Sequence, residues 1–273
     1  MSGPEAPDRA ARTAAYDNNA AVADSAALVR ERNAASAVYR SAHPHGLDVP
    51  YGERERNRVD LYPGDRPETP CLVFLHGGYW QRNGREDFAA VAAGVRHHGW
   101  SAALPGYTLA PAASLTGIVA EVRLALDWLA AHGPAHGIAG PLLLAGWSAG
   151  AQLAALALDH PAVRAGLAVS GVYELGPLRD TTLDDALALT DEELARLSPL
   201  RLPPVRKPLT IAYGSRELPA LVADAKALAR LRAASGAPGE LLEIRDRDHF
   251  TVLRELSSPD GLLTRAALAA PVS

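Results

Sequence analysis

A stretch of nine residues in the middle of the chain decides the fold, and it reads Leu142-Leu143-Leu144-Ala145-Gly146-Trp147-Ser148-Ala149-Gly150. Its first four residues form an apolar run typical of a buried strand, and a helical stretch follows the last glycine. The last five residues fit the pattern Gly-x-Ser-x-Gly, in which a serine projects from a sharp turn between a strand and a helix. Side chains at the two glycine positions would collide with the neighbouring strand and helix. We therefore predict that Ser148 is an activated nucleophile.

Apolar runs and helical stretches alternate along most of the chain. Six runs are almost wholly apolar, at residues 71–75, 100–104, 141–145, 166–169, 209–213 and 241–244. Strands that are apolar on both faces are covered from both sides, which is typical of a parallel sheet with helices above and below. The stretches between them are helical in character, at residues 85–98, 115–132, 152–158 and 220–234. The sequence therefore predicts an α/β fold with a mostly parallel central sheet and helices on both faces.

The domain organisation follows from where this alternation begins and where it is interrupted. Residues 1–15 are predicted to be a disordered lead, and residues 16–273 to form one domain. Residues 173–202 carry acids, threonines and prolines between two core strands, where a plain crossover would be shorter. We expect this stretch to be a small cap-like insertion beside the site.

The segment ahead of the first buried run contains a helix and two extended pieces. Residues 16–39 are predicted to be helical, with the charged residues 30–32 in solvent. Extended segments follow at residues 47–51 and 58–62. The second alternates apolar and polar residues, which predicts a half-exposed antiparallel strand.

A second motif follows the first strongly buried strand, and it reads His76-Gly77-Gly78-Tyr79-Trp80. Paired glycines after a strand leave backbone N–H groups bare, ready to face a developing negative charge. We expect the N–H groups of Gly78 and Tyr79, with Gly77 as an alternative, to form an oxyanion hole together with the N–H of Ala149. His76 itself is interpreted as a structural histidine that braces this loop.

A serine nucleophile needs a base to take its proton and an acid to orient that base. His249 follows the last predicted strand, on a loop that can reach back over the sheet edge, so we predict that it is the base. Glu217 follows the preceding strand and is the preferred acid. Asp246 and Asp248 are rivals because they are close to His249 in sequence, although neighbours on a loop seldom point at one another.

Aromatic and cationic side chains near these turns suggest what the site binds. We predict that three aromatic residues contact the substrate, namely Trp80, Trp147 and Tyr173, although core packing is an equal alternative for Trp80 and Trp147. Arg82 and Arg85 follow the oxyanion loop, and they could hold a substrate carboxylate or could equally be solvated charges.

Composition limits the classes of partner. The chain has 273 residues, 48% of them hydrophobic and 21% charged, with a net charge of −4. Its pI is about 6.1, so nothing calls for nucleic acid or an anionic membrane as a partner. No apolar stretch approaches the roughly 18 residues that span a bilayer, and the first residues do not resemble a secretory signal, so a cytoplasmic protein is expected. The single cysteine, Cys71, is interpreted as a buried structural thiol.

The chain resembles the kynurenine formamidase (arylformamidase) group of α/β-hydrolases, which is close to the carboxylesterases of the hormone-sensitive-lipase type. The similarity runs from about residue 16 to residue 256, and its pieces are Tyr16-Asp17-Asn18-Asn19, Val49-Pro50-Tyr51-Gly52, Asp60-Leu61-Tyr62, His76-Gly77-Gly78-Tyr79-Trp80, Gly146-Trp147-Ser148-Ala149-Gly150, Ser170-Gly171-Val172-Tyr173-Glu174-Leu175, Ser198-Pro199-Leu200 and His249-Phe250. Two positions depart from the pattern. Ala151 stands where relatives often carry a further glycine, and the acid is glutamate where the better-known animal formamidases have aspartate.

The resemblance implies a serine hydrolase with the α/β-hydrolase fold, with Ser148, Glu217 and His249 as its triad. It implies that an aryl formamide of the N-formylkynurenine type is cleaved to formate and an aromatic amine, as in tryptophan catabolism. The alternatives are a carboxylesterase for short-chain acyl esters and a non-catalytic ligand-binding homologue. A small-molecule substrate is expected, with no metal and no organic cofactor. A homodimer is compatible with the sequence, because the cap and the edge strands could each be an interface.

Overall fold

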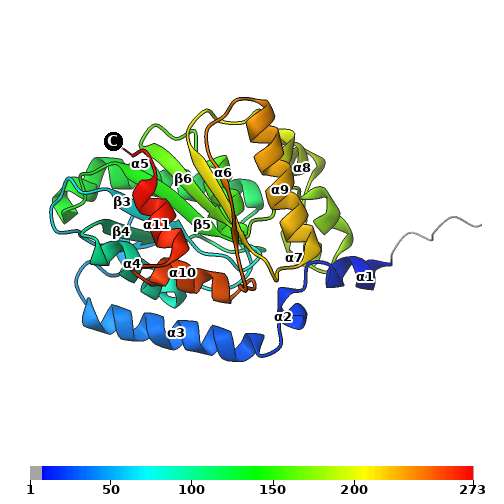
Figure 1. The fold of residues 1–273 in the computed structure, drawn as a ribbon, viewed down its shortest axis with the longest axis horizontal. Helices are drawn as coiled ribbons and strands as arrows, with labels where there is room; N and C mark the ends of the chain where they lie inside the picture. Colours follow the sequence, from blue (N-terminus) through cyan, green and yellow to red (C-terminus); the bar gives the residue numbers. More distant parts are fainter. Residues whose placement is uncertain (1–7, 273) are drawn as a thin grey trace, which may run out of the picture.

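The computed structural model describes residues 8–272, and within this range the strands form one eight-stranded sheet (Figure 1). The strand order is β1-β2-β4-β3-β5-β6-β7-β8. The two antiparallel pairs are β1 with β2 and β2 with β4, and all the other neighbours are parallel. The strands are β1 (Val49–Pro50), β2 (Arg58–Tyr62), β3 (Cys71–Leu75), β4 (Ser101–Pro105), β5 (Leu142–Trp147), β6 (Val163–Val169), β7 (Leu209–Gly214) and β8 (Leu241–Ile244).

Helices precede, connect and follow these strands. The α-helices are α1 (Arg9–Ala14), α2 (Asn18–Ala21), α3 (Ser25–Ala42), α4 (Ala92–His97), α5 (Leu115–His132), α6 (Ala149–Leu156), α7 (Asp184–Leu187), α8 (Asp191–Leu197), α9 (Pro219–Ala234), α10 (Arg254–Ser257) and α11 (Leu262–Ala269). Short 3₁₀ helices are η1 (Arg85–Val91), η2 (Gly133–His136), η3 (Gly176–Asp180), η4 (Pro199–Arg201) and η5 (Thr251–Leu253).

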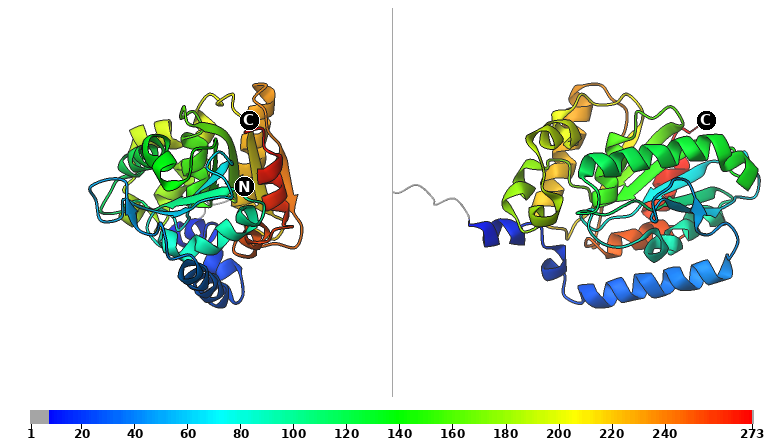
Figure 2. Two further views of the ribbon diagram at one scale, coloured as in Figure 1. Left: turned by 90° about the vertical axis from the view of Figure 1, so that its left-hand side faces the viewer. Right: turned by 180° about the vertical axis from the view of Figure 1, so that it is seen from behind.

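The sheet separates two hydrophobic cores because successive side chains of a strand point to opposite faces. In β3, Cys71 and Val73 belong to the core that α5, α6 and α9 cover. Leu72 and Phe74 belong to the other core, which η1, α4, α10 and α11 cover. Figure 1 shows α11 in front of the sheet, and the view from behind in Figure 2 shows α5 across the opposite face. The prediction of helices on both faces is therefore confirmed.

The observed boundaries of helices and strands agree closely with the predicted ones where the local sequence pattern is strong. β2, β3, β8 and α5 begin and end where the sequence predicts, and β6 extends further toward its N-terminus, starting at Val163. The helix expected at residues 85–98 is divided into η1 and α4. The helix expected at residues 16–39 is also divided, into α2 and α3, with Asp24 between them at a φ of 24°.

The lead predicted to be disordered is helical in the part that the structure describes. Asp8 caps α1 by accepting a hydrogen bond from the N–H of Ala11 at 2.8 Å. The helix is tied to the region between β6 and β7, because Arg9 pairs with Asp185 and Thr13 Oγ1 accepts from the N–H of Thr182 at 3.1 Å. Figure 1 shows α1 next to α7. Tertiary contacts order this segment, and the remaining part of the predicted lead, residues 1–7, lies outside the described residues.

Strand β2 is more buried than its alternation predicts. Asp60 occupies a polar position of the pattern, yet its side chain is fully buried. Arg40 of α3 and Arg85 of η1 both form ion pairs with Asp60, and both also pair with Asp48. A buried carboxylate needs such partners to offset the loss of its hydration. The ion pairs explain why a charged residue lies on a covered face.

Residues 173–202 form η3, α7, α8 and η4 between β6 and β7. Their leucines join the same core as α5 and α6. Gln152 of α6 ties this region to the sheet, because its Nε2 donates to the carbonyl oxygen of Leu197 at 2.7 Å. Figure 1 shows α7 and α8 beside α9 at one end of the molecule.

Candidate active site

Ser148 lies in a strained turn between β5 and α6, with φ of 57° and ψ of −120°. The two flanking glycines make this turn possible. A β-carbon on Gly146 would lie 2.0 Å from the carbonyl oxygen of Gly150, and one on Gly150 would lie 2.0 Å from the carbonyl oxygen of Leu75. These distances exclude any side chain at either position. The strain is held by surrounding contacts, including a hydrogen bond from the N–H of Ser148 to the carbonyl oxygen of Val169 at 2.8 Å.

Glu217 and His249 lie together at the same edge of the sheet. Glu217 follows the end of β7, His249 lies on the loop after β8, and Nδ1 of His249 is 3.1 Å from Oε2 of Glu217. Both side chains are buried, which strengthens a hydrogen bond between them. Trp147 fixes the loop from the other side, because its Nε1 donates to the carbonyl oxygen of His249 at 2.9 Å and the two ring centroids are 4.7 Å apart.

The second oxygen of Glu217 is held by two donors. The hydroxyl of Ser170 donates to Oε1 at 2.5 Å, and the N–H of Gly214 donates to the same oxygen at 2.7 Å. Ser170 follows β6 with a φ of 55° and is fully buried. The sequence pattern gave no role to Ser170, although a serine directly after a buried strand at this sheet edge was a usable signal.

The rival acids have other partners. Asp246 is exposed and pairs with Arg216 at 2.6 Å. Asp248 accepts hydrogen bonds from the N–H groups of Phe250 and Thr251, both at 2.9 Å, so it caps its own loop. Of the three carboxylates weighed from the sequence, Glu217 is the one that contacts the imidazole.

The loop after β3 turns sharply next to Ser148. Gly78 has a φ of 124°, and a β-carbon there would lie 2.4 Å from the carbonyl oxygen of Arg82. Asn83 secures the turn, because its Nδ2 donates to the carbonyl oxygen of Gly77 at 3.0 Å. Within residues 8–272 the backbone N–H groups of Gly78, Tyr79 and Ala149 donate to no acceptor, so these amides are free to bind an anion.

His76 is buried beneath this loop. Its ring stacks on Tyr107 with centroids 4.2 Å apart, and Tyr107 donates to the carbonyl oxygen of His76 at 2.7 Å. Burial lowers the pKa of His76 to about 3, so the ring is neutral. This geometry agrees with a bracing role for His76.

A cavity of about 80 Å³ is lined by Ser148 and His249 together with Gly78, Tyr79, Trp147 and Phe250. Drug-sized pockets have roughly 300–1,000 Å³, so this space suits a small group. The N-terminal helices also line it, through Asn18 and Asn19 of α2 and Arg32 of α3. Asn18 is positioned by Tyr79, whose hydroxyl accepts from Nδ2 of Asn18 at 3.3 Å and donates to the carbonyl oxygen of Tyr16 at 2.6 Å. Sequence reasoning gave no site role to Asn18, Asn19 or Arg32.

Two of the three predicted substrate-binding aromatics lie elsewhere. Trp147 lines the cavity, as expected. Trp80 is fully buried and its Nε1 donates to Oε1 of Gln152 at 3.2 Å, so it packs in the core. Tyr173 is also fully buried, against Gly171, where the missing side chain leaves room for its ring. For Trp80 and Tyr173 the structure corrects the prediction of substrate contact.

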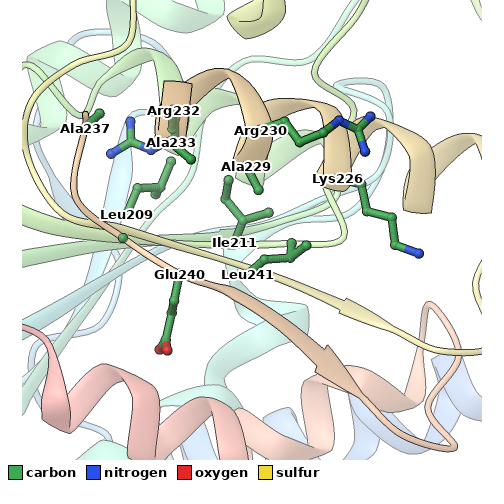
Figure 3. Close-up of a pocket in the computed structure, with 11 residues that line it drawn as sticks. Leu209, Ile211, Lys226, Ala229, Arg230, Arg232, Ala233, Ala237, Glu240 and Leu241 are labelled. Carbon is green, nitrogen blue, oxygen red and sulfur yellow. The ribbon is translucent and has the colours of Figure 1, made fainter. Parts of the chain in front are cut away.

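A cavity of about 390 Å³ lies away from this site, between α9 and the end of the sheet formed by β7 and β8 (Figure 3). Its wall includes Arg232, whose guanidinium donates to the carbonyl oxygens of Val205, Lys207 and Pro238. No serine, cysteine or histidine lines this cavity. In the described part of the chain no group of three His, Cys, Asp or Glu side chains is arranged to hold a metal ion.

The strand order, the strained serine turn and the polar residues that follow successive strands define an α/β-hydrolase, and the chain is a hydrolase of this class. The family model described as BD-FAE matches residues 59–161. Kynurenine formamidase from Salmo salar is 30% identical over 239 residues, which cover 81% of this chain and 80% of the relative. Kynurenine formamidase from Danio rerio is 28% identical over 238 residues, with the same coverage of 81% and 80%. The chain belongs to the kynurenine formamidase family.

Solved structures agree with the fold. A protein from Silicibacter, provisionally described as a thioesterase, has a TM-score of 0.84 and 26% identity, covering 94% of this chain and 98% of that one. The esterase LipW from Mycobacterium marinum has a TM-score of 0.71 and 18% identity, covering 92% and 91%. Esterase B from Lactobacillus rhamnosis has a TM-score of 0.70 and 18% identity, covering 90% and 94%. None of the helices in residues 8–272 combines the length and the apolar character that a membrane-spanning segment requires.

Proposed function

We propose that this hydrolase is a serine enzyme that cleaves an aryl formamide of the N-formylkynurenine type and releases formate and an aromatic amine. One observation carries the proposal. His249, which is hydrogen-bonded to Glu217, lines the same cavity as Ser148, next to amides that have no acceptor among residues 8–272.

The first half of the reaction forms a covalent intermediate. His249 takes the proton of the Ser148 hydroxyl as its oxygen attacks the formyl carbon, and Glu217 holds the imidazole in the required tautomer. The amides of Gly78, Tyr79 and Ala149 stabilise the resulting oxyanion. The C–N bond then breaks, His249 gives its proton to the leaving amine, and a formyl ester remains on Ser148.

The second half restores the enzyme. Water takes the place of the amine, and His249 removes its proton as the oxygen attacks the formyl ester. The ester bond breaks, the proton returns to the Ser148 oxygen, and formic acid leaves and ionises to formate in water. The two half-reactions balance with the residues of the chain and one water molecule.

The size of the cavity supports a small acyl group. A space of about 80 Å³ around Ser148 suits a formyl group, the smallest acyl group, and Trp147 and Phe250 offer aromatic surface beside it. Membership of the kynurenine formamidase family supports the aromatic amine. We place such an activity in tryptophan catabolism and in the cytoplasm, with a small-molecule substrate and with a homodimer as its assembly.

Formate release tests the proposal. Purified protein is expected to release formate from N-formyl-L-kynurenine with a kcat/KM well above that for p-nitrophenyl acetate and butyrate. A higher kcat/KM for the esters than for the formamide supports the second candidate, a carboxylesterase for short-chain acyl esters. That candidate is favoured by the fold it shares with solved esterases and by the same small acyl space.

A fluorophosphonate probe separates both enzymes from a non-catalytic homologue. Wild-type protein is expected to be labelled, and Ser148→Ala is expected to lose the label. Persistent labelling of Ser148→Ala, or an unlabelled wild-type protein, would contradict the role of Ser148 as nucleophile.

A further inference from the structure

The charges on the wall of the active-site cavity are all of one kind. Besides His249, the side chains among its lining residues that can carry a charge near neutral pH are Arg32 and Arg82, and no aspartate or glutamate lines it. In a small, partly desolvated space, cations without carboxylate partners favour an anionic ligand. The cavity therefore has a charge that the hydrolysis of a neutral formyl group does not require.

Arg32 is held in place without an acidic partner. Its guanidinium carbon lies 4.0 Å from the centroid of the Phe88 ring, and its Nε and Nη2 donate to Oδ1 of Asn33 at 3.1 and 2.8 Å. Within the described residues it forms no ion pair, and its Nη1 makes no hydrogen bond. The N–H groups of Nη1 are therefore available to a ligand.

Burial removes part of the hydration of the Arg32 guanidinium. Loss of hydration lowers the pKa of Arg32 to about 10, although the nearby charge of Asp87 opposes the shift. Asp87 itself accepts from the N–H of Gly84 at 2.8 Å and does not pair with Arg32. The neighbouring Glu31 pairs with Arg254. A bound carboxylate would give the half-buried guanidinium the partner that the protein does not supply.

Arg32 also lies between two spaces. A second cavity of about 340 Å³ is lined by α3, η1, η5 and α10, and it shares Arg32 and Phe250 with the cavity at Ser148. Its other charged residues, Glu31 and Arg254, pair with each other. Much of its remaining wall is apolar, formed by Leu28, Ala35, Ala90, Val91 and Leu253. An aromatic amine that extends from the formyl site past Phe250 would meet apolar surface and the guanidinium of Arg32 together.

The arginines that follow the oxyanion loop differ from Arg32. Arg85 is committed to ion pairs with Asp48 and Asp60, so it is not available to a substrate. Arg82 is exposed at the rim, between the cavity at Ser148 and a further cavity of about 210 Å³. An exposed charge is screened by salt and contributes less to binding than a half-buried one. Arg32 is therefore the principal candidate.

We propose that Arg32 binds a carboxylate carried by the amine portion of the substrate, so that the enzyme selects aryl formamides that bear this carboxylate over those of the same shape that lack it. The inference rests on the proposed function, because it assigns the leaving group of that reaction a charge and a binding residue. It makes Arg32 a specificity residue that contacts substrate away from the reacting bond.

The test compares two substrates that differ only at the carboxylate, N-formyl-L-kynurenine and its primary carboxamide. Wild-type protein is expected to show a kcat/KM at least about 10-fold higher for the carboxylate, which corresponds to about 1.4 kcal/mol. Arg32→Gln is expected to reduce this ratio to less than about 3-fold, mainly through KM, and Arg32→Lys to restore part of it. Arg30→Gln is the matched control, because Arg30 is exposed on the same helix and lines neither cavity. It is expected to keep the wild-type ratio.

A binding measurement separates this inference from the proposed reaction. Calorimetry with Ser148→Ala protein compares the dissociation constants of L-kynurenine and its carboxamide, with and without Arg32→Gln. If wild-type protein hydrolyses neither formamide but Ser148→Ala binds the carboxylate preferentially through Arg32, the reaction is wrong and the binding role stands. If wild-type protein hydrolyses both formamides equally, or if Arg32→Gln keeps the wild-type preference, the role of Arg32 is overturned and the reaction stands. A change in stability alone would affect both ligands equally, so it cannot imitate the expected result.

Discussion

Gly77 lies directly against Ser148. A β-carbon on Gly77 would lie 2.8 Å from the β-carbon of Ser148 and 2.7 Å from both the ring and the carbonyl oxygen of Trp147. Real β-carbons do not approach other atoms this closely. The loop that bears the free amides and the turn that bears the serine are therefore in contact only because residue 77 has no side chain.

Gly77→Ala is expected to lower kcat/KM by at least about 100-fold, because either the serine or the anion-binding loop must shift. The measurement is hydrolysis together with the rate of fluorophosphonate labelling, on protein whose circular dichroism shows that it is folded. Gly117→Ala in α5 is the control. Its β-carbon would meet its nearest neighbour at 3.6 Å, so it should stabilise the helix by about 0.5–1 kcal/mol and leave the rate unchanged. A folded Gly77→Ala protein with the wild-type rate would contradict the contact.

Glu217→Gln is expected to lower kcat by about 10⁴-fold, because an amide does not hold the imidazole in the same tautomer or stabilise its charged form. Asp246→Asn and Asp248→Asn are expected to change kcat less than about 3-fold, since the first pairs with Arg216 and the second caps its own loop. Steady-state kinetics on the three proteins decides between the acids. A large loss in Asp246→Asn or Asp248→Asn with little loss in Glu217→Gln would reverse the assignment.

Ser170→Ala is expected to lower kcat about 10-fold with little change in KM, because it removes one of two donors to the carboxylate oxygen that faces away from His249. Ser215→Ala removes a comparable hydroxyl, one that accepts from the N–H of Asp246 at 2.9 Å in an exposed turn, and is expected to have no effect on kcat. Equal effects of the two substitutions, or a change in KM alone for Ser170→Ala, would show that Ser170 does not position the acid.

Asp224→Asn is expected to stabilise the protein at pH 7.5 but not near pH 4. Burial raises the pKa of Asp224 from its ordinary value of 3.8 to about 6, even though its carboxylate accepts from the N–H groups of Tyr173 and Glu174. A carboxyl group with a raised pKa contributes stability below its unfolded pKa, and this contribution is lost as the pH rises through about 6. The loss is at most about 3 kcal/mol, since one pKa unit corresponds to about 1.4 kcal/mol.

Urea unfolding of wild type and Asp224→Asn at the two pH values measures this difference, and the exposed Asp260→Asn serves as the control. The amide oxygen of asparagine can still accept both backbone hydrogen bonds, so the substitution removes mainly the charge. A difference between the two proteins that is the same at both pH values would contradict the raised pKa.

The parts of the fold that the sequence predicts well depend on short-range patterns. The residues of β3 are apolar on both faces because both faces are covered, and Gly146, Ser148 and Gly150 form one turn with its own steric requirements. Strand ends that carry Ser148, Glu217 and His249 meet at one edge because parallel strands all point the same way. Local information is sufficient for these features.

The parts that sequence reasoning missed depend on contacts between distant residues. In the sequence Arg32 has the pattern of a solvated charge on a helix, and only the structure shows that it lies beside Phe88 and the cavity. Ser170 donates a hydrogen bond to Glu217, which lies 47 residues further along the sequence, and no rule of sequence spacing predicts this pair. Trp80 shows the reverse error, because an aromatic residue next to a catalytic loop can also point into the core, where Gln152 binds its indole N–H.

The cavity at Ser148 is walled by residues from both ends of the chain, with Asn18 and Arg32 on one side and His249 on the other. Neither segment encloses the cavity alone, so its shape depends on the folded chain as a whole. A truncation that removes α2 and α3 is therefore expected to open the cavity to solvent even though Ser148, Glu217 and His249 all remain.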